Sequence, residues 1–98
     1  MRRGTTPTLT FGVPRDFREA ESVFVTIKQH GKVVVDISKE EMNITENEIS
    51  CTLTQKQTLA LDCNNRCKIQ VRVKLHGVAL ASNVVFADVC EILKDGEI

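Results

Sequence analysis

An alternating run in the second half of the chain does most to limit the possible folds. From Cys67 to His76 the sequence CKIQVRVKLH carries an apolar side chain at every second position and a polar side chain between. Successive side chains of a strand point to opposite faces, so this spacing predicts a β-strand with one buried and one solvated face. The buried face needs a cover, which the rest of the chain must supply as a second layer.

Shorter strand patterns follow one another along the rest of the chain. The stretch Thr6–Val13 alternates, and Pro7 near its start favours an edge strand because proline has no backbone N–H to donate. The runs SVFVTIKQ and KVVVDIS flank His30-Gly31 and predict a β-hairpin. A second hairpin is predicted to turn at Glu46-Asn47, and VVFADVCEIL is predicted as the last strand.

The periodicity changes once, after the second hairpin. Thr54 is followed three residues later by Gln57, which is the spacing of a capping box and predicts one or two helical turns. About seven short strands with one short helix predict an all-β fold, an immunoglobulin-like antiparallel β-sandwich. The 98 residues fit a single domain, in which residues 1–5 and 94–98 are expected to be flexible tails.

Both histidines belong to a repeated tetrapeptide, K-x-H-G, at Lys28–Gly31 and Lys74–Gly77. Glycine readily takes the positive φ that a tight hairpin turn demands, and histidine is tolerated beside it. No local pattern of the H-E-x-x-H type accompanies either histidine. The repeat therefore predicts two hairpin turns rather than a pair of functional histidines.

Charge and composition narrow the classes of function. The 13 lysines and arginines balance the 13 aspartates and glutamates, so the surplus of cations that binds nucleic acid is missing. The four phenylalanines are the only aromatic residues, and no apolar run approaches the ~20 residues of a membrane helix. We therefore expect neither nucleic acid nor a membrane as partner. The opening MRRGTTPTLTF lacks a signal-peptide pattern, so the cysteines are expected to be thiols in a reducing cytoplasm.

The cysteines offer only a weak metal-binding signal. Cys63 and Cys67 lie four residues apart in CNNRC, a spacing that a zinc knuckle allows, but a second knuckle is missing. We therefore expect no metal and no cofactor, with these two cysteines as the weak candidates. An enzyme is not expected either, because no nucleophile, base and orienting group form a recognisable set.

Two candidate surfaces for protein contact lie on predicted strands. The N-terminal edge strand, with Thr8 and Thr10, has an unpaired backbone that can accept a strand from a neighbour. On the solvated face of the long strand, a cationic stripe of Lys68, Arg72 and Lys74 is suited to an acidic partner, or keeps that face soluble.

A third candidate surface lies on the first hairpin. Val33, Val35 and Ile37 are expected on its buried face, whereas Phe24 and Val34 interrupt the opposite, polar face. Phe24 and Val34 are expected to lie opposite one another or diagonally across the strand pair, where they would cover a second sheet or a partner.

Three stretches of the sequence are familiar as a set. They are the opening MRRGTTPTLTF, the middle CTLTQKQTLAL, and the run VRVKLHGVALASN followed by EILKDGEI. With them the chain resembles short proteins encoded among the structural genes of tailed phages and prophages of Gram-positive, clostridia-like bacteria. The resemblance covers nearly the whole chain, but the four cysteines depart from that pattern.

The resemblance implies a non-enzymatic, virion-associated structural protein of the tail, baseplate or fibre region. Its implied partners are other phage structural proteins, with a homo-oligomer as an open possibility. Its implied location is the bacterial cytoplasm during synthesis and the virion after assembly. Alternatives from other classes are a small carbohydrate- or metal-binding module and an assembly factor that is not retained in the particle. Scarce aromatic residues weigh against sugar binding.

Overall fold

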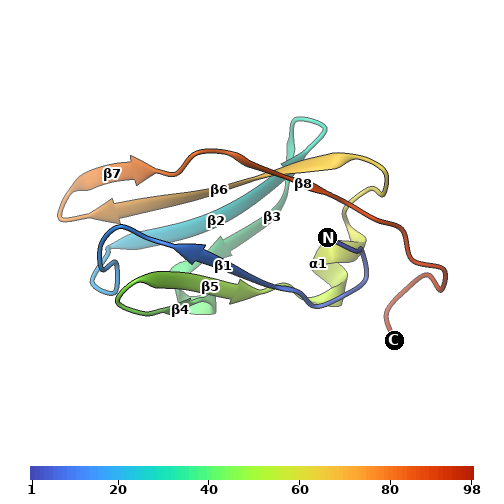
Figure 1. The fold of residues 1–98 in the computed structure, drawn as a ribbon, viewed down its shortest axis with the longest axis horizontal. Coiled ribbons are helices and arrows are strands. Elements are labelled where there is room, and N and C mark those ends of the chain that lie inside the picture. The colour runs from blue at the N-terminus through green and yellow to red at the C-terminus, as the bar shows by residue number, and fades with distance from the viewer.

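A computed structural model describes all residues, 1–98, as two antiparallel β-sheets packed face to face with one short α-helix (Figure 1). The all-β sandwich expected from the sequence is confirmed. Its elements, in chain order, are β1 (Thr8–Gly12), β2 (Ser22–Gln29), β3 (Lys32–Ser38), the 3-10 turn η1 (Lys39–Glu41), β4 (Asn43–Ile44), β5 (Glu48–Thr52), α1 (Gln55–Leu59), β6 (Arg66–Leu75), β7 (Val78–Ala81) and β8 (Val85–Asp88).

The larger sheet is built around β6. Its order is β3-β2-β6, and both β7 and β8 pair with the remaining edge of β6. β7 covers the C-terminal half of β6 and β8 covers the N-terminal half. Between them Ser82 continues the pairing: its N–H donates to the carbonyl of Val71 at 2.9 Å, and its hydroxyl accepts the N–H of Val71 at 3.0 Å. The last strand expected over residues 84–93 is present as β8 but ends at Asp88, so it is shorter than predicted.

The smaller sheet has the order β1-β5-β4, and the core lies between it and the larger sheet. The inner face of the larger sheet contributes alternating residues that are almost wholly buried, as the long run CKIQVRVKLH predicted. The core also takes residues from the smaller sheet and the connections, including Phe17, Ile49, Leu53, Leu61 and Val89. Burial of these side chains is the main favourable contribution to the folding free energy.

The strand order is that of an immunoglobulin-like sandwich without its first strand. In that fold one sheet runs A-B-E-D and the other contains C, F and G. Here β1, β5 and β4 take the places of B, E and D, while β3, β2, β6 and the β7–β8 pair take those of C′, C, F and G. The chain places no strand beside β1, because its first residues run elsewhere: Arg2 pairs in parallel with Cys90, beyond β8.

The two K-x-H-G segments are both tight hairpin turns, as predicted. His30 and Gly31 have φ values of 55° and 73°, and His76 and Gly77 have values of 50° and 79°. Two consecutive residues with positive φ make a two-residue turn whose twist matches that of the flanking strands. The carboxylate of Glu21 accepts the N–H groups of His76 and Gly77 at 2.8 and 2.9 Å, which ties the second turn to the start of β2.

The first hairpin is irregular at a point that the alternation did not predict. The register of β2 against β3 shifts between Ile27 and Lys28, where Ile27 pairs with Val35 but Lys28 pairs with Val33. The extra residue, Val34, forms a β-bulge, and beyond it the inward and outward faces exchange. Val33 is therefore 54% exposed, not buried as expected, whereas Val35 and Ile37 are buried.

The helix begins as the capping box predicted. The Thr54 hydroxyl accepts the N–H of Gln57 at 3.1 Å, and the Gln57 side chain accepts the N–H of Thr54 at 2.8 Å. These two bonds satisfy donors that a helix N-terminus otherwise leaves free, and they start a helix of five residues. No helix of the structure has the length and apolar character needed to cross a membrane.

Both chain ends make contacts with this helical region. The guanidinium of Arg3 donates to the carbonyls of Leu59 at 2.8 Å and Leu61 at 2.9 Å. The side chain of Gln55 exchanges two hydrogen bonds with the backbone of Ile98. These bonds attach Arg3 and Ile98 to the helical region.

Matched alanine substitutions test the core. Val25→Ala removes two methyl groups from a fully buried position, whereas Val33→Ala removes the same groups beyond the bulge, where the side chain is 54% exposed. We expect Val25→Ala to lower the free energy of unfolding by about 2–4 kcal/mol and Val33→Ala to change it by about 0.5 kcal/mol. Urea denaturation measures both. Equal losses would place Val33 in the core and contradict the bulge.

The contact of Glu21 with the second turn predicts an acid-sensitive contribution to stability. Hydrogen bonds from the backbone N–H groups of Gly77 and His76 hold the pKa of Glu21 below its usual value. Because the folded-state pKa is depressed, the stabilisation is present above the unfolded pKa of about 4.3 and is lost as the pH falls through the lower folded value. Glu21→Gln should flatten this part of the stability–pH curve. A stability–pH curve that keeps its slope in Glu21→Gln would rule out this role of Glu21. Glu19→Gln is the control, and it should leave the curve unchanged.

Candidate interaction surface

The free edge of β1 presents an unpaired row of backbone groups. The carbonyl of Pro7 accepts from Leu53 at 2.9 Å, and the N–H of Val13 donates to Asn47 at 3.0 Å. Hydrogen-bonded pairs alternate along an antiparallel ladder, so every odd-numbered residue from 7 to 13 bonds inward to β5. The N–H and carbonyl groups of Thr8, Thr10 and Gly12 therefore point outward, and no strand of the chain pairs with them.

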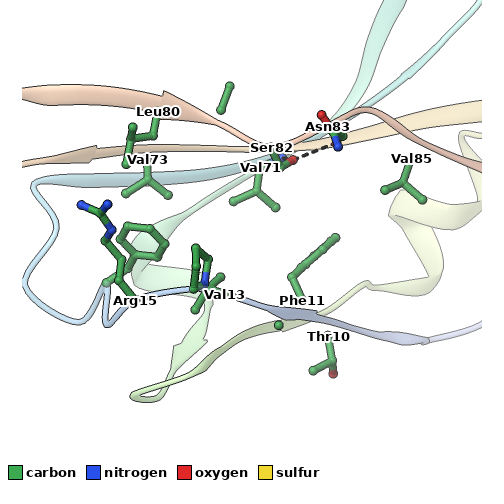
Figure 2. A pocket seen from close by; sticks show the side chains of 14 residues that line it. Thr10, Phe11, Val13, Arg15, Val71, Val73, Leu80, Ser82, Asn83 and Val85 are labelled. Atoms are coloured by element: carbon green, nitrogen blue, oxygen red, sulfur yellow. Dashed lines mark hydrogen bonds between the residues drawn. The ribbon is translucent and has the colours of Figure 1, made fainter.

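Beside this edge an apolar groove of about 610 Å³ opens between the two sheets. Figure 2 shows Phe11 and Val13 reaching into it from β1 and the following residue, and Val71, Val73 and Leu80 reaching in from the larger sheet. Val71 and Val73 are buried, whereas the other three are half-buried. The groove is thus an open end of the core that is lined by both sheets.

The residues that follow β1 form the end of the groove. Val13 and Pro14 lead the chain away from the smaller sheet, and Phe17 turns inward to line the groove while 95% of its surface is buried. Arg15 lies at that end, and its guanidinium makes no ion pair (Figure 2). It is therefore the charged group that an occupant of the groove would meet.

The other sheet edges are protected, and β1 is not. Charged side chains, bulges and very short strands all discourage pairing with another chain. β3 carries the bulge together with exposed Lys32 and Asp36, β4 has two residues, and β7 and β8 have four each. β1 has five residues without a charge or a bulge, as an edge strand between Pro7 and Pro14. The edge expected from the sequence is therefore present and open.

The side chains of Thr8 and Thr10 lie on the outer face of β1, and Thr10 also borders the groove. Both are exposed, and the hydroxyl of Thr8 shares a hydrogen bond of 2.8 Å with that of Thr52 on β5. Leu9 and Phe11, between and beyond them, face the core and are half-buried. The strand thus carries small polar side chains on one face and apolar ones on the other, with open backbone groups along its edge.

The cationic stripe lies on the outer face of the larger sheet. Lys68, Arg72 and Lys74 are exposed and point outward from β6, whereas the alternate residues Ile69, Val71 and Val73 are buried. The ammonium of Lys68 stacks over the ring of Phe86 at 5.9 Å from its centroid, a favourable cation–π contact. Phe24, 41% exposed, pairs with Arg72 across β2 and β6. Cations and apolar rings therefore alternate on this face.

Phe24 and Val34 do not meet, contrary to the expectation from the hairpin. Phe24 pairs with Ser38 in the register of β2 and β3, while Val34 lies in the bulge between the pairs made by Val33 and Val35. Val34 is half-buried against the core, so it adds nothing to an exposed surface around Phe24. The register is the cause, because a regular ladder would place Val34 opposite Lys28, four residues from Phe24, and the bulge only turns Val34 toward the core.

The two candidate metal ligands differ in accessibility. Cys67 is fully buried on the inner face of β6, and this burial raises the pKa of its thiol, which disfavours the thiolate that binds metal. Cys63 is half-buried in the loop before β6. Nowhere in the structure do three or more histidine, cysteine, aspartate or glutamate side chains gather as a metal site would require.

The polar cluster at the first turn has a structural role. The side chain of buried Gln29 accepts the N–H of Asp62 at 2.7 Å and donates to its carbonyl at 2.9 Å. The ring Nε2 of His30 lies 2.7 Å from the carboxylate of Asp62, in an exposed pair. These bonds attach the β2–β3 turn to the loop after α1. They also explain how the polar side chain of Gln29 can be buried at the end of β2.

The groove itself was not predicted from the sequence. Phe11, Val13 and Leu80 come from segments far apart in the chain, and their half-burial depends on how the two sheets meet. The available signal was the inward-pointing Phe17 in an otherwise polar segment. This surface can offer a binding partner backbone hydrogen bonds along the edge of β1 and apolar contacts in the groove beside it.

Comparison of the chain with protein-family models, with curated proteins and with solved structures found no match. The function proposed below therefore rests on the surfaces described above and on the resemblance of the sequence to short phage and prophage proteins.

Thiol reactivity tests the placement of the cysteines. Burial also raises the pKa of Cys51, so Cys51 and Cys67 should resist iodoacetamide in the folded protein, whereas exposed Cys90 should react. Mass spectrometry of peptides from protein alkylated with and without urea measures each site. Rapid modification of Cys67 without urea would contradict its place in the core. Zinc measured in protein that was purified without chelator would support the metal-binding alternative.

Proposed function

We propose that the chain is a non-enzymatic structural protein of a phage or prophage particle that acts through protein–protein contacts in the tail, baseplate or fibre region. The observation that carries the contact role is the open edge of β1, with its outward-pointing backbone groups and the apolar groove beside it. An added strand uses such an edge for hydrogen bonds and such a groove for its apolar side chains.

The place in a phage particle has a separate support. It rests on a resemblance to short proteins encoded among the structural genes of tailed phages and prophages, which is carried by the stretches MRRGTTPTLTF, CTLTQKQTLAL and VRVKLHGVALASN with EILKDGEI. The cationic stripe on β6 offers a second contact surface, on the outer face of the larger sheet. Two separate contact surfaces suit a component that touches more than one neighbour. An acidic surface is the partner that its charge favours.

The outer face of the larger sheet also bears on the carbohydrate-binding alternative. Phe24 and Phe86 are 41% and 55% exposed there, yet Lys68 already covers the ring of Phe86. A sugar-binding face needs open aromatic rings, so the protein-contact function is the better supported of the two.

Quantitative mass spectrometry of purified particles tests the proposal. After prophage induction in the source strain, the chain should co-purify with tail proteins at a fixed copy number. Its ratio to the tail proteins would then give the symmetry of the ring or spike that it forms. The same measurement on the cleared lysate is the control. A chain that is abundant in the lysate but absent from particles would overturn the structural role and favour an assembly factor.

A further inference from the structure

We propose that the free edge of β1 pairs with β1 of a second copy of this chain, antiparallel and centred on Thr10. This inference rests on the proposed contact function, for which it names one partner. The place beside β1 is that of strand A in an immunoglobulin-like sandwich, where the neighbouring strand also runs antiparallel. In the dimer, β1 of the second copy occupies that place, and a two-fold axis at Thr10 relates the two strands.

The backbone groups of β1 are in the right phase for this pairing. Thr8, Thr10 and Gly12 point their N–H and carbonyl groups to the open edge, as the bonds of Pro7 and Val13 to β5 establish. In the two-fold arrangement Thr10 faces Thr10 of the second copy, and Thr8 faces Gly12. Each of these is a hydrogen-bonded pair of an antiparallel ladder. All three outward-pointing residues of the strand are satisfied at once.

The side chains are self-complementary in the same register. On the inner face Leu9 of each copy lies opposite Phe11 of the other, so two half-buried apolar side chains on each strand gain a cover. On the outer face the axis brings two threonines together, and glycine at position 12 leaves room for Thr8 of the second copy. Even a Cβ added at Gly12 would meet nothing within 4 Å, so the outer face is sterically open there.

Charge favours a second copy over a charged peptide. A two-fold axis brings the residue at the centre of the strand next to its own copy, so a charged residue there would face a like charge. From Pro7 to Pro14 the chain carries no charge at all. Arg15 lies beyond the paired strand, because the chain leaves the smaller sheet at Val13 and Pro14. The self-pairing of β3, in contrast, would bury the charges of Lys32 and Asp36 beside its bulge.

The expected area indicates a reversible dimer. A standard interface buries roughly 30 Å² for each participating residue, so the five residues of β1 would bury about 300 Å² in total for two copies, to which the rim of the groove adds. This is below the about 1,200 Å² of a stable interface. The dimer should therefore grow with concentration, and an assembled particle that holds copies close together would favour it.

Charge-swap variants at Thr10 test the pairing and its register. In analytical ultracentrifugation the wild-type chain should show a concentration-dependent dimer. Thr10→Lys and Thr10→Glu should each weaken it by about tenfold or more, because like charges meet at the axis. An equimolar mixture of the two variants should restore dimers. Thr52→Lys is the matched control, since it adds the same charge on the same outer face one strand further in.

Cross-linking gives a second, independent measurement. Opposite residues of a hydrogen-bonded pair have Cα atoms about 5.5 Å apart, which suits a disulfide. In a Cys63→Ser/Cys90→Ser background, Thr10→Cys should form a covalent dimer on oxidation, and Thr52→Cys should not. A strictly monomeric wild-type chain, equal effects of Thr10→Lys and Thr52→Lys, or no recovery on mixing would each overturn the pairing.

The outcomes separate this inference from the proposed function. If the chain is monomeric in solution but present in particles at a fixed ratio, the second copy is the wrong occupant of the edge and the structural function stands. If the Thr10-centred dimer forms but the chain is absent from particles, the pairing stands and the proposed function fails.

Discussion

The structure depends on the pairing of β6 with β2. β6 is the longest strand, and it bonds to β2 along one edge and to both β7 and β8 along the other. Its inner face and that of β2 supply alternating residues that are nearly all fully buried, so these two strands form the floor of the core. Everything else packs against this floor: β3 extends it, the smaller sheet covers most of it, and α1 closes one end.

The smaller sheet covers the floor incompletely, and this explains where the molecule is open. Three strands face a larger sheet, and the place beside β1 that an immunoglobulin-like sandwich fills with strand A receives no segment of the chain. The floor residues Val71 and Val73 are therefore reached by a groove, while Phe11 and Leu80 at its rim stay half-buried. One missing strand thus creates the unpaired edge and the exposed apolar surface together, which is the pair of features that strand addition requires.

Local signals predicted most of the fold correctly. The capping box of Thr54 and Gln57 and the two histidine–glycine turns involve neighbours in sequence, so their geometry follows from short-range hydrogen bonds and from the φ preferences of glycine. The alternation of the long strand predicted its buried face because that face has a strict period of two. The bulge at Val34 escaped prediction, since KVVVDIS alternates equally well with or without it. The groove also escaped, because its lining comes from strands distant in the chain.

By itself the sequence determined the strands, the turns, the short helix and the residues that had to be covered. Each of these depends on side-chain periodicity or on bonds between near neighbours. Only the tertiary structure decided that β7 and β8 share one edge of β6 and that the first residues run to Cys90 instead of along β1. The packing of the two sheets likewise decided that an apolar groove opens beside the strand Thr8–Gly12, whose edge position the sequence had predicted. Which strands pair depends on the free energies of all possible pairings and on the core surface that each pairing buries. A local sequence pattern does not contain that information.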